Sequence, residues 1–130
     1  MRWFIAALIV GLWIGPQAPA SAFPERRVQD CVCHGMARVV SIGGTRADCM
    51  DARAVTEIDR TDKWAEAIGQ ALYYASQTRL RPRVVLFCDR RAGLCLAHAL
   101  RFEAAVATID VEVELVRIDG SQIAAACGQR

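Results

Sequence analysis

The sequence has little excess charge of either sign, and it is almost without lysine. It contains 16 basic and 14 acidic residues, and Lys63 is the only lysine. This balance excludes a strongly basic protein that coats nucleic acid along its length. The sequence also lacks an apolar run long enough to cross a bilayer, which excludes a bundle of membrane-spanning helices.

The N-terminal segment is typical of a secretory signal peptide. In residues 1–22, Arg2 is the only charge, an apolar run extends from Trp3 to Ile14, and Ala20-Ser21-Ala22 forms a small-x-small cleavage pattern. The run is too short to span a bilayer. We therefore predict cleavage after Ala22, a single mature domain of residues 23–130, and a periplasmic or secreted location with no membrane span.

Six cysteines lie in the predicted mature domain, and they favour a framework of disulfides because an exported domain of this size has a small core. Cys88 and Cys95 flank a short loop and are the best-justified pair; closing that loop would contribute about 2.5 kcal/mol. Cys31 or Cys33 could join Cys127 and tie the ends together. Zinc binding by Cys31, Cys33, His34 and a distant cysteine is an alternative, mainly if the chain is not exported. The six candidates are Cys31, Cys33, Cys49, Cys88, Cys95 and Cys127.

Hydrophobic periodicity predicts an α/β (α+β) sandwich in the order β-β-β-α-β-α-β, with both helices covering one mixed sheet. A turn at Gly43-Gly44 separates the first two strands. Thr61 or Asp62 is expected to cap the first helix. Residues 24–30 are expected to be an extended lead-in, with strands at 37–42, 45–50, 54–59, the "VVLFC" run and 110–118, and helices from the cap to about 77 and at 94–108.

Acidic residues gather where the third predicted strand ends. Glu57 and Asp59 are two residues apart, so their side chains share one face of that strand. Asp48 lies on the preceding strand and could reach the same side. Three carboxylates suit a hard cation such as Mg²⁺, which prefers oxygen ligands.

The following helix carries a polar stripe formed by Lys63, Gln70 and Tyr74. It is separate from the apolar stripe that begins at Trp64, so we expect it to line a cleft rather than the core. An ammonium beside a metal is an arrangement that activates water and stabilises a phosphoryl group.

Asp48, then Glu57-x-Asp59, then Gln70-x-x-x-Tyr74 resembles the PD-(D/E)XK nuclease superfamily, which has a restriction-endonuclease-like fold. The pattern is most similar to the recombination-exonuclease branch with its Gln-x-x-x-Tyr helix motif. The resemblance covers roughly residues 37–118. It implies that Asp48 and Glu57 match the acidic positions, and that Gln70 and Tyr74 belong to the active site and to DNA binding.

Two features depart from that family. Asp59 stands where the family pattern has lysine, and Lys63 lies four residues further on, a position to which the lysine migrates in some of these nucleases. The predicted export and disulfides are also unusual for such enzymes.

Two hypotheses follow. The first is an exported, Mg²⁺-dependent nuclease acting on nucleic acid, with DNA as the candidate partner. In this hypothesis Asp48, Glu57 and Asp59 hold the metal, the same three acids and Lys63 are catalytic, and Gln70 and Tyr74 bind the substrate. The second is a catalytically inactive secreted domain that uses a nuclease-like scaffold to bind a partner.

Overall fold

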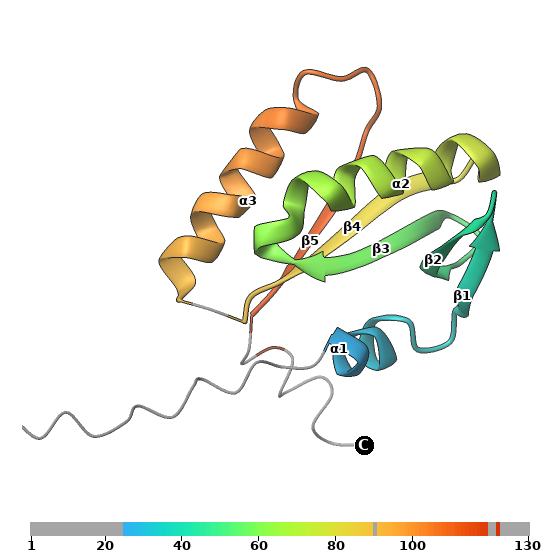
Figure 1. Ribbon diagram of the computed structural model, residues 1–130, viewed down its shortest axis with the longest axis horizontal. Helices are drawn as coiled ribbons and strands as arrows, with labels where there is room; N and C mark the ends of the chain where they lie inside the picture. Colours follow the sequence, from blue (N-terminus) through green and yellow to red (C-terminus); the bar gives the residue numbers. More distant parts are fainter. Residues whose placement is uncertain (1–24, 90, 120–121, 123–130) are drawn as a thin grey trace, which may run out of the picture.

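One mixed sheet of five strands organises the chain (Figure 1). The structure, a computed structural model, describes residues 25–89, 91–119 and 122. Its elements in chain order are α1 (Glu25–Val32), β1 (Ala37–Ile42), β2 (Thr45–Met50), β3 (Ala54–Arg60), the 3₁₀ helix η1 (Thr61–Lys63), α2 (Trp64–Thr78), β4 (Arg81–Phe87), α3 (Ala92–Val106) and β5 (Glu114–Ile118).

The sheet has the strand order β1-β2-β3-β4-β5. β1, β2 and β3 form an antiparallel meander, whereas β3, β4 and β5 are parallel and are connected through α2 and α3. The turn between β2 and β3 is stabilised by Asp51, whose Oδ1 accepts hydrogen bonds from the backbone N–H groups of Arg53 (2.7 Å) and Ala54 (2.9 Å). The predicted α/β class and the order β-β-β-α-β-α-β are confirmed.

The helices form a layer on each face of the sheet. α1 packs against the face that carries Ile58, Val85 and Phe87, through its buried residue Val28. α2 and α3 pack on the opposite face, where one cluster is formed by Ala67, Ala71, Val84, Leu86 and Phe102. Alternation along β3 and β4 therefore sends successive side chains to different helices.

Three sequence expectations about element boundaries are wrong. Residues 25–32 are helical rather than extended, because Val28 and Val32, one turn apart, pack on the sheet. Neither Thr61 nor Asp62 caps α2: its N-cap is Lys63, which makes no side-chain capping bond, and Thr61 begins η1 instead. β5 begins at Glu114 rather than at residue 110.

Two disulfides are described: one joins the segment after α1 to β2, and the other closes a short loop between β4 and α3. Cys88–Cys95 is confirmed, and it links the end of β4 to α3. Cys33 pairs with Cys49 and connects the segment after α1 to β2, so the expected Cys33–Cys127 alternative is wrong. Cys31 is also disulfide-bonded, and Cys127 lies outside the described residues. These bonds are consistent with an extracellular or periplasmic location.

The predicted signal peptide, residues 1–22, lies outside the described residues. Within the described part of the chain, no helix is both long and apolar enough to cross a membrane.

We expect Gly43→Ala to lower the free energy of unfolding more than Gly44→Ala does. Both glycines have positive φ, so alanine costs about 1–2 kcal/mol at either position. At Gly43 the added Cβ would also overlap the hydroxyl of Tyr73, which donates a 3.2 Å hydrogen bond to the Gly43 carbonyl, and displacing it adds about 1 kcal/mol. Urea denaturation of both variants measures the difference; equal losses would contradict this account of the turn.

Candidate functional site

The site begins where β2 separates from β3. Their register pairs Cys49 with Thr56 and Met50 with Val55, and no earlier residue of β2 pairs with β3. A continued ladder would place Ala47 opposite Ile58. Instead, the N–H of Ile58 donates a 2.7 Å hydrogen bond to Oδ2 of Asp48. The Asp48 carboxylate therefore takes the place of a missing ladder acceptor.

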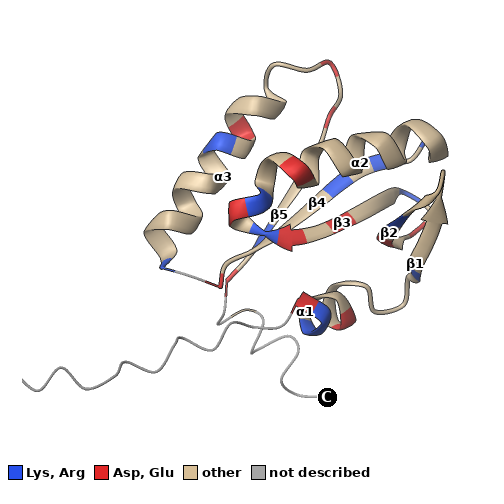
Figure 2. Cartoon of the chain, in the orientation of Figure 1, with Lys and Arg blue, Asp and Glu red and all other residues tan. Residues whose placement is uncertain are grey.

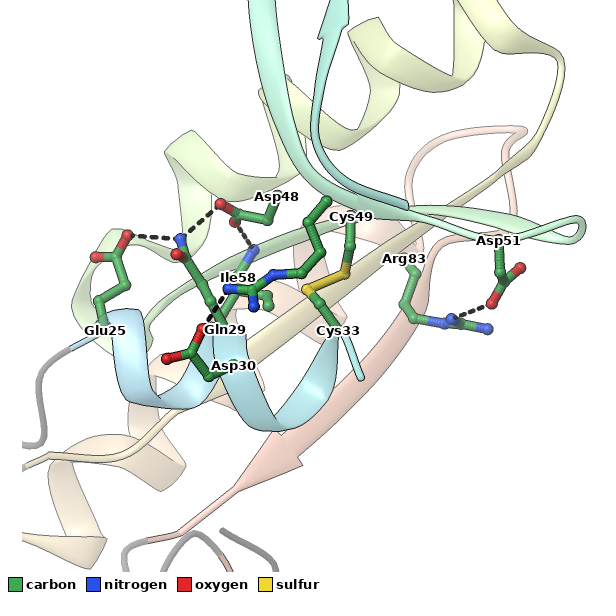
Figure 3. The surroundings of a disulfide bond; sticks show 10 residues. Glu25, Gln29, Asp30, Cys33, Asp48, Cys49, Asp51, Ile58 and Arg83 are labelled. Atoms are coloured by element: carbon green, nitrogen blue, oxygen red, sulfur yellow. Dashed lines mark hydrogen bonds and ion pairs between the residues drawn. A yellow bond between two sulfur atoms is a disulfide. The ribbon is translucent and has the colours of Figure 1, made fainter. Parts of the chain in front are cut away.

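Asp48 also contacts α1 (Figure 3). Its Oδ1 accepts a 2.6 Å hydrogen bond from Nε2 of Gln29, and the same amide lies 3.4 Å from Oε1 of Glu25. The pKa of Asp48 is raised to about 6, mainly by burial; the Ile58 hydrogen bond opposes the rise, and the charges of Glu25 and Asp59 contribute to it. Glu25 and Gln29 thus belong to the site, although they lie in the segment expected from the sequence to be an extended lead-in.

Glu57 is the most perturbed carboxyl group of the site. Its side chain shares the α2 face of the sheet with Val55, and only 8% of the residue is exposed. Its Oε2 atom is buried and has no hydrogen-bond partner in the described part of the chain. Burial is the main reason that the pKa of Glu57 is raised to about 9, and the charges of Asp48 and then Asp59 contribute to the same rise. At neutral pH, with no cation beside it, Glu57 therefore retains its proton.

Asp59 connects this acidic group to Lys63. Asp59 is buried, and its Oδ1 accepts a 2.9 Å hydrogen bond from the Arg60 N–H and lies 3.8 Å from Nζ of Lys63. Burial raises the pKa of Asp59, while the Arg60 N–H and Lys63 oppose that rise. The lysine side chain is 44% exposed, so the ion pair itself contributes little stability and Nζ stays accessible. Figure 2 shows that acidic and basic residues gather at the end of β3 and the start of α2.

Gln70 and Tyr74 do not form a common cleft-lining stripe with Lys63. Tyr74 is 3% exposed and belongs to a core cluster with Val55, so the expected location outside the core is wrong for this residue. Its hydroxyl donates a 2.9 Å hydrogen bond to the Arg46 carbonyl, which fixes β2 to α2 beside the point of separation. Gln70 is half-buried, and its Oε1 has no partner among the described residues.

The predicted acids lie close enough for their charges to interact, but they do not form a complete metal-binding site. Asp48 and Asp59 both raise the pKa of Glu57. Among the residues that the structure describes, no group of three or more His, Cys, Asp or Glu side chains could hold a metal ion. The zinc alternative at Cys31, Cys33 and His34 is wrong, because Cys33 is bonded to Cys49.

Comparisons of the chain with protein-family models, with curated proteins and with solved structures gave no match. The functional argument therefore depends on the geometry of the site and on the motif resemblance described above.

We predict that stability falls as the pH rises from about 4.5 toward 9, because Glu57 has a pKa of about 9 in the folded chain and an ordinary value of 4.5. In that interval the folded state keeps a proton that the unfolded state has released, so raising the pH favours unfolding. Glu57→Gln removes this titration and should stabilise the protein at pH 8 by about 1–3 kcal/mol.

The measurement is urea denaturation across the pH range, without divalent cations. Glu103→Gln is the matched control, since Glu103 is exposed on α3. A Glu57→Gln variant with the same pH dependence as the wild-type protein and the control would contradict the prediction.

Proposed function

We propose that this protein is an exported, Mg²⁺-dependent nuclease that hydrolyses phosphodiester bonds of nucleic acid. The observation that carries the proposal is Glu57: a buried carboxyl group with an unpartnered oxygen, within the electrostatic influence of Asp48 and of Asp59, and Asp59 in turn pairs with the accessible Lys63. A buried acid with no cationic partner is costly for a fold, and such groups concentrate at functional sites.

The donor chemistry of the site fits a hard divalent cation. Mg²⁺ is commonly held by one or two carboxylates, with water and substrate phosphate completing its coordination, so a preassembled cage of three acids is not required. Glu57 and Asp48 would hold the ion, with Asp59 assisting. Once bound, Mg²⁺ would polarise the phosphate and lower the pKa of a coordinated water molecule.

The remaining residues have roles that follow from their positions. Lys63 presents its Nζ beside Asp59 with part of the side chain in solvent, where it can orient water or stabilise charge on the phosphoryl group. Gln70 has a buried amide oxygen with no partner in the described part of the chain, and a small rotation of its side chain would let it position the substrate. Tyr74 acts indirectly, because its hydroxyl already bonds Arg46 and keeps β2 in place.

The resemblance to PD-(D/E)XK nucleases supports this proposal. The meander, the following helix and the fourth strand occur in the order of that superfamily's core. Lys63 lies beside Asp59, which occupies the position where the family pattern has lysine. Its ammonium group could therefore take the role of that lysine. The signal-like N-terminus and the disulfides support export to the periplasm or the extracellular space.

The alternative, an inactive scaffold that binds a partner, is favoured by one specific observation. Both oxygens of Asp48 already accept hydrogen bonds, from Gln29 and from Ile58, as in a residue with a purely structural role. On that hypothesis, Asp48→Ala and Lys63→Ala leave function nearly unchanged, and the protein binds no Mg²⁺ at this site.

We expect the purified protein to cleave linear or supercoiled DNA, or RNA, in the presence of Mg²⁺ and not in EDTA. Glu57→Gln and Lys63→Met should each reduce the cleavage rate by about 100-fold or more, because they remove a metal ligand and the charge that stabilises the transition state. Glu103→Gln should cleave at the wild-type rate.

Calorimetry of Mg²⁺ binding accompanies the assay and separates the two hypotheses. Absence of Mg²⁺-dependent cleavage, together with Mg²⁺ binding that Glu57→Gln does not weaken, would refute the proposed nuclease.

A further inference from the structure

A second site of distinct chemistry lies at the amino-terminal ends of β3, β4 and β5. A cavity of about 590 Å³ there is lined by three arginines, one acid and one alanine: Arg53, Arg81, Arg83, Glu114 and Ala54. Arg53 precedes β3, whereas Arg81 and Arg83 belong to β4. Three guanidinium groups around one cavity indicate a preference for an anion.

The cavity lies on the α1 face of the sheet, beyond the part that α1 covers. Arg81 and Arg83 alternate in phase with Val85, which packs against α1, so their side chains emerge on that face. α1 contacts the carboxyl-terminal halves of β3 and β4, at Ile58 and Phe87. On this face, α1 does not extend over the amino-terminal halves, which on the other face are covered by α2.

Arg83 is held in a fixed orientation. Its Nη1 donates a 3.2 Å hydrogen bond to Oδ2 of Asp51 (Figure 3), and its Nε lies 3.1 Å from Oε1 of Glu114 on the neighbouring strand. Asp51 is itself anchored by two backbone N–H groups of the turn. Only 18% of the Arg83 side chain is exposed, so its guanidinium forms a rigid floor for the cavity.

Arg53 and Arg81 differ from Arg83 because their charges are not compensated. Both are exposed, and neither side chain has an ion pair or a hydrogen bond with any described residue. Stabilising the strand ends requires only Arg83 with its two acids. The additional arginines place two further positive charges at the same cavity, which a tetrahedral dianion or a phosphodiester could bridge.

We propose that this arginine cavity, formed by Arg53, Arg81 and Arg83, binds a phosphate group. The phosphate could belong to a nucleic-acid backbone or be free in solution, since both present the same oxygen acceptors. The proposal does not depend on the nuclease activity, because the cavity is built from other residues and requires no metal.

NMR spectroscopy in EDTA tests the site directly, through the Nε–H signals of the three arginines. Inorganic phosphate is titrated first, then a single-stranded DNA decamer, and then a decamer of the same sequence with uncharged methylphosphonate linkages. We expect the signals to shift with phosphate, with DNA or with both, and not with the uncharged strand. A response to phosphate alone identifies the small anion as the ligand, and a response to DNA identifies the backbone. If neither anion moves the signals, the proposal is overturned.

Variants provide the second arm. Arg53→Gln and Arg81→Gln should each weaken binding of the ligand that shifts the signals by about threefold to tenfold. If that ligand is DNA, each variant should also lower the slope of log Kd against log salt concentration by about one. Arg101→Gln removes an equal charge from α3, on the other face of the sheet, and should bind as the wild type does. Equal binding by Arg81→Gln and Arg101→Gln would overturn the proposal, whatever the result of the cleavage assay.

Discussion

The hydrogen bond from the Ile58 N–H to the Asp48 carboxylate is the constraint from which the candidate site follows. A buried backbone donor must find an acceptor, and here the ladder partner is absent because the residues of β2 before Cys49 do not pair with β3. Asp48 can supply the acceptor only if β2 stays close to β3 while diverging from it. Glu57 precedes Ile58 in β3, where β2 no longer pairs with β3, and its Oε2 has no partner in the described part of the chain.

Several other contacts hold the two strands in this arrangement. The Cys33–Cys49 disulfide fixes β2 to the end of α1 at the residue next to Asp48, and Tyr74 fixes Arg46 to α2. These contacts lie on opposite faces of the sheet, so β2 is restrained from both sides. Crowded acids that would otherwise repel one another are thereby kept in place, which is the condition under which a cation binds most favourably.

The sequence predicted the strands and the two long helices because their apolar periods are strong, and the two-residue spacing of Glu57 and Asp59 correctly placed both on one face. It did not predict α1, since Val28 is that helix's one buried residue and charged neighbours surround it. Glu25 and Gln29 were missed for the same reason. The burial of Tyr74 depends on contacts between distant segments, which no local pattern encodes.

The central claim is that Glu57 is a buried, protonated acid that a divalent cation converts to a ligand. The most direct measurement is a ¹³C NMR titration of its carboxyl group with and without Mg²⁺. The account predicts a pKa of about 9 without the ion, and a marked fall when Mg²⁺ is added. A Glu57 carboxyl group that titrates near its ordinary value of 4.5, and does not respond to Mg²⁺, would contradict it.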